Sequence, residues 1–238
     1  MVAVVSHKIE YFHEREKLIG FVAYPEGGKT LPGMLIVHDW AGLNELYQNK
    51  AIELAKQGYV AFSVDMYGHG RVGESNEEKQ ALMASIVNDR AYLRQRVHLG
   101  LEQLKKSSAV DANRIGAIGF CFGGLCVLDL ARMGANLKGV ASFHGILKGA
   151  PECVTDAIKA QILILHGYDD TMVSPQDVIV FCEEMKQNKA QFQVNMYSNT
   201  VHAFTNPNAH DSSLGTVYQP QTAKKSYEAM RAFFQDIL

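Results

Sequence analysis

The feature that most constrains the fold is a series of short apolar segments separated by helical stretches. Six segments of strand length recur along the chain, and all but the last are nearly continuous runs of apolar residues. They are Met34–His38, Val60–Val64, Arg114–Gly119, Gly139–Phe143, Gln161–His166 and Phe192–Tyr197. Strands of this kind are typically buried on both faces, as in a parallel sheet covered by helices. The alternation therefore predicts βαβ units around a mostly parallel sheet.

Amphipathic stretches separate these strands, and we expect a helix in each of them. The predicted helices are Leu46–Gln57, Glu77–Lys106, Leu125–Met133, Pro175–Asn188 and Gln221–Asp236. Gly134 follows the third helix and is predicted to cap its C-terminus. The N-terminal segment differs, because Val4–Phe12 and Leu18–Tyr24 flank the charged turn His13–Lys17. This pattern predicts an antiparallel hairpin that supplies the first strands of the sheet.

Length and charge narrow the class of protein. The chain has 238 residues, 47% of them hydrophobic, which is enough for the core of one α/β domain, so we predict a single domain over residues 1–238. The net charge is −2 and the basic residues are scattered, so we expect no binding to nucleic acid or anionic lipid. No segment approaches the roughly 20 apolar residues of a membrane helix, and the apolar N-terminal run is too short for a signal peptide. Nothing in the sequence specifies an oligomeric state.

The cysteines point to a reducing compartment. The chain has four, namely Cys121, Cys126, Cys153 and Cys182. They form neither a Cys-x-x-Cys pair nor a cluster with histidine at zinc-binding spacing. Free thiols without a metal site are typical of the cytoplasm, so we expect a cytoplasmic protein.

Cys121 lies at the centre of the most informative motif, the sequence G-F-C-F-G-G over Gly119–Gly124. The motif directly follows a predicted strand and precedes a predicted helix. This is the pattern of a nucleophile elbow in which cysteine replaces serine, because a strained turn lifts the nucleophile above a helix N-terminus and flanking glycines allow close backbone approach. The helix dipole at this point favours a thiolate. The alternative is a buried structural cysteine beside a glycine turn.

An acid and a base follow Cys121 in the chain order of an α/β hydrolase. Asp169 and Asp170 come after the predicted strand Gln161–Leu165, and His202 comes after the next strand. In this fold an acid at the end of one strand orients a histidine from a later loop, and that histidine reaches the nucleophile. Spacing does not choose between the two aspartates, because an Asp pair after a strand also forms turns and helix N-caps.

Two other histidines are less suited than His202 to the role of base. His144 and His166 also end predicted strands, but each precedes a glycine in a turn that fits packing better than catalysis. The alternative for His202 itself is a histidine on a surface loop.

Acyl transfer also needs hydrogen-bond donors for the developing oxyanion. These are usually the N–H of the residue after the nucleophile and one from an earlier loop at the end of a strand. The predicted donors are Phe122 and Trp40. Trp40 lies in the segment His38–Gly42, where a predicted strand ends in a polar dipeptide followed by the single tryptophan of the chain. It is equally consistent with a wall of the substrate pocket.

With these motifs, the chain resembles the dienelactone hydrolase (carboxymethylenebutenolidase) family of the α/β-hydrolase superfamily over nearly its whole length. The cysteine elbow is the most specific part of the resemblance. The supporting segments are Val37–Trp40, Val64–Gly68, Ser142–Gly145, His166–Val173 and His202–Phe204. The resemblance implies an α/β-hydrolase fold with a mostly parallel central sheet of about eight strands, helices on both faces and an N-terminal antiparallel hairpin.

The resemblance also implies roles for individual residues. Cys121 corresponds to the nucleophile, Asp170 to the acid by its place in the motif, and His202 to the base. In the family an acidic residue at the position of Asp39, commonly Glu, contacts the thiol of the resting nucleophile and holds it unreactive until substrate displaces the carboxylate. Asp39 is one methylene shorter than glutamate.

The chain departs from the family at two arginines that bind the substrate carboxylate in dienelactone-cleaving members. His69 stands approximately at the first position, and Asn206 stands at the second, four residues beyond His202. Arg71 is near enough to His69 in sequence to replace the first arginine in part, although an arginine on a loop is usually solvated. Without bidentate recognition of a carboxylate by arginine, the resemblance supports esters and lactones in general more strongly than dienelactone itself.

These residues predict a hydrolase that acts on a small-molecule ester or lactone. Cys121 is expected to form a thioester, and His202, oriented by Asp170, is expected to activate water, without a metal or an organic cofactor. The alternatives are a thioesterase or acyltransferase on the same site, a thiol redox sensor or ligand-binding protein without turnover, and an inactive scaffold. The His–Asp pair argues against a sensor, because sensing needs no base to activate water.

Overall fold

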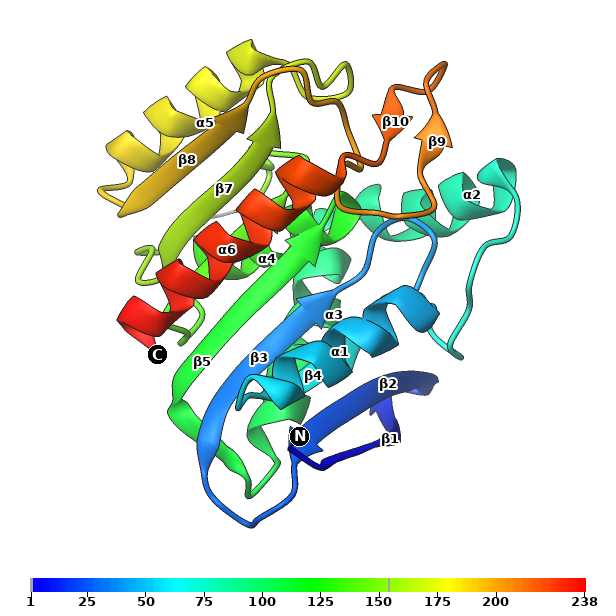
Figure 1. The fold of residues 1–238 in the computed structure, drawn as a ribbon, viewed down its shortest axis with the longest axis vertical. Coiled ribbons are helices and arrows are strands. Elements are labelled where there is room, and N and C mark those ends of the chain that lie inside the picture. The colour runs from blue at the N-terminus through cyan, green and yellow to red at the C-terminus, as the bar shows by residue number, and fades with distance from the viewer. Residues whose placement is uncertain (1, 154) are drawn as a thin grey trace. The chain divides into compact units, whose positions relative to one another are not determined.

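The computed structural model describes residues 2–153 and 155–238. Eight strands form one sheet with the order β1-β2-β4-β3-β5-β6-β7-β8 (Figure 1). The chain divides into two compact units, one ending at Ile118 and the other running from Gly119 to Leu238. The boundary falls within β5 (Val110–Phe120). Within the described residues, no helix is long and apolar enough to span a membrane.

The first unit begins with the predicted antiparallel hairpin. Its strands pair from Val4 with Pro25 to His13 with Glu16, so the turn is shorter than the charged segment of the sequence. The unit then adds a parallel pair, β3 and β4, and β2 pairs antiparallel with β4. The elements are β1 (Val4–His13), β2 (Glu16–Pro25), β3 (Leu31–Val37), α1 (Glu45–Lys56) and β4 (Val60–Val64). The hairpin predicted from the sequence is confirmed.

Helices cover both faces of β4. The Ser63 hydroxyl donates to the carbonyl of Tyr47 on α1 at 2.9 Å. The next residue, Val64, faces α3 (Arg90–Lys105), where a Cβ on Gly100 would lie 2.7 Å from a methyl of Val64. Because successive side chains of a strand point to opposite faces, α1 and α3 lie on opposite sides.

One predicted helix is wrong, because Glu77–Lys106 is two helices. They are α2 (Asn76–Val87) and α3, separated by Asn88 and Asp89. Asp89 has an extended backbone, and its carboxylate accepts a hydrogen bond from the Tyr92 N–H at 2.9 Å, which caps α3. The sequence pattern hides this break because apolar residues continue at helical spacing on both sides. An Asp that satisfies free N–H groups of a new helix favours that break.

The second unit contains parallel strands, with helices on both sides of β6. Its strands β6 (Gly139–Phe143), β7 (Gln161–Gly167) and β8 (Phe192–Tyr197) pair in parallel register. Ser142 faces Gly124 of α4 (Phe122–Arg132), whereas a Cβ on Gly139 would lie 3.0 Å from Phe233 of α6 (Pro220–Ile237). These two residues of β6 point to opposite faces, so α4 and α6 flank the strand. The remaining helix is α5 (Pro175–Gln187).

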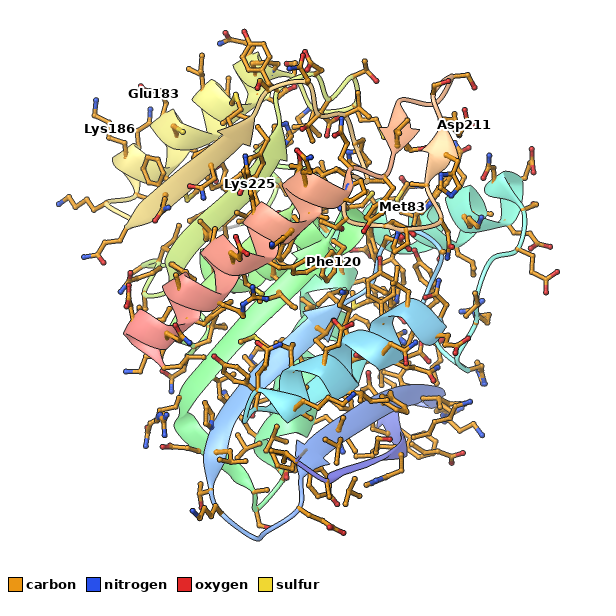
Figure 2. All side chains as sticks on the ribbon, viewed as in Figure 1. Met83, Phe120, Glu183, Lys186, Asp211 and Lys225 are labelled. Carbon is orange, nitrogen blue, oxygen red and sulfur yellow. The ribbon has the colours of Figure 1, made fainter. Side chains whose placement is uncertain are left out.

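Two local features of the second unit are the C-terminal cap of α4 and a small hairpin after residue 206. Gly134 follows α4 with a φ of +66°, and its N–H donates to Ala131, as predicted for a C-terminal cap. The irregular stretch after residue 206 contains a small hairpin that the sequence did not reveal, β9 (His210–Asp211) and β10 (Thr216–Val217). Its turn is held by Asp211, which is labelled in Figure 2. The Asp211 carboxylate accepts hydrogen bonds from the N–H groups of Ser213 and Leu214.

Candidate active site

Cys121 occupies a strained turn between β5 and α4. Its φ of 52° and ψ of −113° are rare for any residue other than glycine. The Cys121 N–H donates to the carbonyl of Phe143 at 3.0 Å, and its own carbonyl accepts from Gly124 at 2.9 Å. Phe120, labelled at the end of β5 in Figure 2, stacks on Phe143 with ring centroids 4.8 Å apart. The half-buried thiol is thus carried on a turn that the neighbouring strand holds in place.

The glycines on either side of Cys121 allow this turn to pack closely. A Cβ on Gly119 would overlap the carbonyl of Gly123 and lie 2.7 Å from the nitrogen of Gly124. A Cβ on Gly124 would lie 2.6 Å from the Cα of Gly145. Both contacts are closer than real Cβ atoms tolerate, so the turn and the start of α4 require glycine here.

His202 is hydrogen-bonded to Asp170 and not to Asp169. The His202 Nδ1 lies 2.7 Å from Asp170 Oδ2, and both side chains are buried. The other oxygen, Oδ1, accepts from the N–H groups of Met172 at 2.9 Å and Val173 at 3.0 Å, which fixes the carboxylate. Asp169 is exposed. The alternative left open by the sequence is thereby resolved in favour of Asp170 as the partner of His202.

Cys121 is the second group that influences the charge of His202. Burial lowers the pKa of His202, but the charge of Cys121 and the hydrogen bond with Asp170 outweigh it and raise the pKa to about 10. Within the described residues, the Nε2 atom of His202 has no partner at hydrogen-bonding geometry. Contacts between a resting nucleophile and its base are often long and poorly aligned until substrate binds. The Cys121 charge and the Asp170 hydrogen bond thus favour the protonated form of His202.

The charge of Asp170 complements that of His202. Burial raises the pKa of Asp170, but the hydrogen bond and the positive charge of His202 outweigh burial and lower it. A carboxylate beside an imidazolium is the arrangement in which each stabilises the charge of the other.

Asp39 and Trp40 belong to the first unit, in the loop after β3. Asp39 is buried, its Oδ1 accepts from the Ala41 N–H at 2.9 Å, and burial raises the pKa of its carboxyl. Trp40 is half-buried, and its carbonyl accepts from the Tyr67 hydroxyl at 3.0 Å. The Lys79 ammonium lies 5.7 Å from the centroid of the Trp40 ring. Phe122, the other predicted oxyanion donor, is the first residue of α4 in the second unit.

The two candidate substrate-binding residues on the loop after β4 are exposed. His69 has a φ of 55°, and its backbone N–H donates to Lys17 at 2.8 Å. The Arg71 guanidinium donates to Glu16 at 3.3 Å and to the carbonyl of Gly68 at 3.2 Å. Arg71 thus ties its own loop to the hairpin, which is a structural use of its charge.

Asn206 shapes the loop that follows His202. Its N–H donates to the Ala203 carbonyl at 2.9 Å, and its Oδ1 accepts from the Asn208 N–H at 2.9 Å. The loop is further held by the Val217 N–H, which donates to the His202 carbonyl at 3.2 Å.

The sequence pattern did not single out Asp65. Its buried carboxylate accepts hydrogen bonds from the N–H groups of Ile19, Tyr67, Gly68 and Gly70, at 2.8 to 3.0 Å. It organises the loop after β4 from within. An aspartate directly after a continuous apolar strand and before a glycine was the available signal.

His166 and His144 are both buried, as a packing role requires. The His166 Nε2 lies 2.9 Å from the Val173 carbonyl. The His144 Nε2 lies 2.8 Å from Thr205 Oγ1, and its ring lies 5.1 Å from the ring of His202. The sequence did not reveal this second contact, because the two histidines are 58 positions apart.

In the described ranges, no group of three or more His, Cys, Asp or Glu side chains is arranged to hold a metal ion. All four cysteines are free thiols.

Comparison with known proteins gives one consistent family. The sequence profile of the Dienelactone hydrolase family matches residues 18–238. A Bradyrhizobium sp. protein named "Probable 2-oxo-3-(5-oxofuran-2-ylidene)propanoate lactonase" is 28% identical over 199 residues, which cover 79% of each chain. The solved structure of m3DLH is 33% identical with a TM-score of 0.93. That of P91, a dienelactone hydrolase-like promiscuous phosphotriesterase from metagenomic libraries, is 31% identical with a TM-score of 0.92. Both structural matches cover 99% of each chain.

Proposed function

Because the chain belongs to the dienelactone hydrolase family and is a lactone or ester hydrolase with an α/β-hydrolase fold, we propose that it cleaves its substrate through a thioester on Cys121. The observations that carry this proposal are the strained Cys121 turn and a His202 that is hydrogen-bonded to Asp170 and whose pKa is raised by the charge of Cys121. Cys121 is the nucleophile, His202 the acid and base, and Asp170 the group that orients His202. The reaction requires no cofactor.

The first half of the reaction acylates Cys121. The thiolate attacks the carbonyl carbon of the ester or lactone, and the carbonyl π electrons move to oxygen. The N–H groups of Phe122 and Trp40 stabilise this oxyanion. When the intermediate collapses, the bond to the leaving oxygen breaks, and the His202 imidazolium gives its proton to the departing alkoxide or enolate. The product is a neutral thioester on Cys121.

Acylation itself prepares His202 for the second half. The charge of Cys121 is the largest influence that raises the pKa of His202, and the thioester removes this charge. The pKa of His202 therefore falls, and the neutral ring accepts a proton from water. The resulting hydroxide attacks the thioester, and collapse releases the acid and restores the thiolate. Asp170 holds the ring in one tautomer throughout.

The chemistry of the nucleophile favours activated substrates. A thiolate is a good leaving group, so attack on an unactivated alkyl ester tends to reverse. Enol lactones and aryl esters have stabilised leaving groups, so their tetrahedral intermediates collapse to the thioester. The exposed Arg71 already pairs with Glu16, and Asn206 carries no charge, so a strongly anionic substrate is disfavoured. We place the protein in the cytoplasm, where its thiols stay reduced.

Asp39 controls the resting thiol in this proposal. Its carboxyl is buried with a raised pKa, so it takes up a proton at higher pH than an exposed aspartate does. Displacement of this group by the substrate would release Cys121 for attack.

The experiment that tests the mechanism compares two cysteines. In C121A we expect turnover of a chromogenic aryl ester to fall roughly a thousandfold, since the nucleophile is lost. C182A is the matched control, because Cys182 is also a half-buried free thiol but lies on α5. Wild-type protein should show a burst of phenolate followed by steady turnover, with acyl-Cys121 detectable by mass spectrometry. Full activity of C121A would exclude the proposed nucleophile.

A phosphotriester is a second candidate substrate, favoured by the 31% identity to P91 over 99% of both chains. Attack of Cys121 on phosphorus would release an aryl oxide and leave a phosphorylated thiol. Turnover of an aryl dialkyl phosphate by wild-type protein but not by C121A would support this activity.

A further inference from the structure

His144 is a buried histidine that the proposed reaction does not use. It follows β6 directly, with 2% of its surface exposed and a backbone φ of 39°. Its N–H donates to the Leu165 carbonyl at 2.8 Å, and the preceding carbonyl, of Phe143, accepts from Cys121 at 3.0 Å. The backbone around His144 is thus bonded both to the turn of the nucleophile and to β7. A non-glycine residue in this conformation is rare and is kept where the surroundings enforce it.

The His144 ring contacts three residues of the turn that carries the base. It packs edge-to-face against His202, with centroids 5.1 Å apart and planes at 64°. It packs in the same manner against Phe204, at 5.1 Å and 80°. Its Nε2 lies 2.8 Å from the hydroxyl oxygen of Thr205, a buried residue. One side chain therefore contacts residues on both sides of Ala203.

The turn needs such support because its backbone is strained. Ala203 has a φ of 57°, which a residue with a Cβ rarely adopts. The hydrogen bond between Asp170 and His202 holds one ring nitrogen but leaves the ring free to tilt about that bond. Edge-to-face packing of His144 restricts this tilt, since aromatic pairs have preferred geometries.

The charge state of His144 fits the same role. Burial, followed by the charges of His202 and His166, keeps the pKa of His144 well below its usual value, so its ring is neutral. A second cation beside the imidazolium would weaken the attraction between His202 and Cys121. The Nδ1 atom of His144 has no hydrogen-bond partner within the described residues, so the buried polar ring is kept at an energetic cost.

We propose that His144, held by Thr205, is a positioning residue that keeps the His202 ring directed at Cys121. The inference rests on the proposed function, because it concerns the same base. It makes His144 neither an acid nor a base in the reaction. Its contribution is to fix one orientation of the ring that exchanges protons.

Two threonines of one loop provide a matched test. T205V removes the hydroxyl bonded to His144 and keeps the shape of the side chain. T200V makes the same change at Thr200, which is also buried but bonds to the Ser198 carbonyl and the Thr222 hydroxyl, each at 3.1 Å. We measure kcat and KM for the aryl ester, and the rate at which iodoacetamide alkylates Cys121 across pH.

We expect T205V to lower kcat roughly tenfold to a hundredfold with little change in KM, since small displacements of a catalytic group cost this much. Alkylation of Cys121 should shift to higher pH, because a displaced imidazolium stabilises the thiolate less. T200V should match the wild type in all three measurements. H144F keeps the aromatic packing but loses Nε2, so it should resemble T205V, and adding T205V to it should cost nothing further.

The outcomes separate this proposal from the previous one. If T205V and T200V behave alike, with equal kcat and equal alkylation profiles, the positioning role is wrong even though Cys121 remains the nucleophile. If C121A retains full turnover, the proposed function itself fails. Should H144F not fold, as judged by circular dichroism, the comparison of T205V with T200V decides alone.

Discussion

The Nδ1 of His202 lies 2.7 Å from the Oδ2 of Asp170, and these two buried residues are 32 positions apart in the sequence. The neighbouring Asp169 is exposed and takes no part in this contact. The parallel pairing of β7 with β8 explains the arrangement, because it aligns the carboxyl ends of the two strands, from which both loops leave. We therefore expect Asp170 and Asp169 to differ in their importance for catalysis, and this difference can be measured.

We predict that D170N lowers kcat for an aryl ester by roughly a thousandfold, because the amide no longer holds His202 in the required tautomer. D169N, the same change one residue earlier on an exposed side chain, should stay within about twofold of the wild type. Steady-state kinetics on both variants check the prediction. Comparable losses in the two variants would contradict it.

The raised pKa of His202 makes stability depend on pH in a defined direction. The folded protein holds this proton up to about pH 10, whereas an unfolded histidine releases it near pH 6.5. The stabilisation is therefore complete below about pH 6.5 and is lost as the pH rises toward 10. We expect urea denaturation to show this decline, and H202Q to show a shallower one. The same slope in both proteins would argue against a protonated His202.

Because α4 closely approaches the loop after β6, we expect any side chain at position 124 to destabilise the protein. G124A places a Cβ 2.6 Å from the Cα of Gly145, and backbone cannot move away as easily as a side chain. We expect a loss of about 1–3 kcal/mol in the free energy of unfolding. The control is G149A, whose Cβ would first meet the end of the Glu184 side chain, at 3.2 Å. Chemical denaturation should show a small change for G149A, and equal losses would refute the explanation.

The Asp65 carboxylate is predicted to be essential for the loop after β4. D65N keeps the shape but replaces one acceptor oxygen by a donor, which leaves backbone N–H groups of that loop without a partner. We expect a loss of about 1–3 kcal/mol in the free energy of unfolding. D111N is the control, because Asp111 also accepts from a backbone N–H, that of Asn113 at 3.0 Å, but is only half-buried near the start of β5. Urea denaturation that finds D65N as stable as D111N would show that the loop does not depend on the charge.

Much of the fold follows from local sequence patterns. The continuous apolar runs predicted the buried strands, and the alternation with amphipathic stretches predicted the mostly parallel sheet and its helices. The glycines around Cys121 predicted a tight turn, which the φ of 52° at Cys121 confirms. The break at Asp89 escaped this reasoning, because a capping aspartate and a helical aspartate look alike until the chain is seen to turn.

The features of the candidate site likewise fall into those that the sequence predicts and those that depend on the tertiary structure. The sequence by itself determined which chemical groups follow one another along the chain, because backbone sterics and apolar periodicity act over a few residues. Only the tertiary structure decided that Asp170 and not Asp169 meets His202, that Arg71 is bonded to Glu16, and that His144 lies against His202. Such contacts join residues tens of positions apart. They depend on the register of neighbouring strands and on the space left between packed side chains, which no short stretch of sequence encodes.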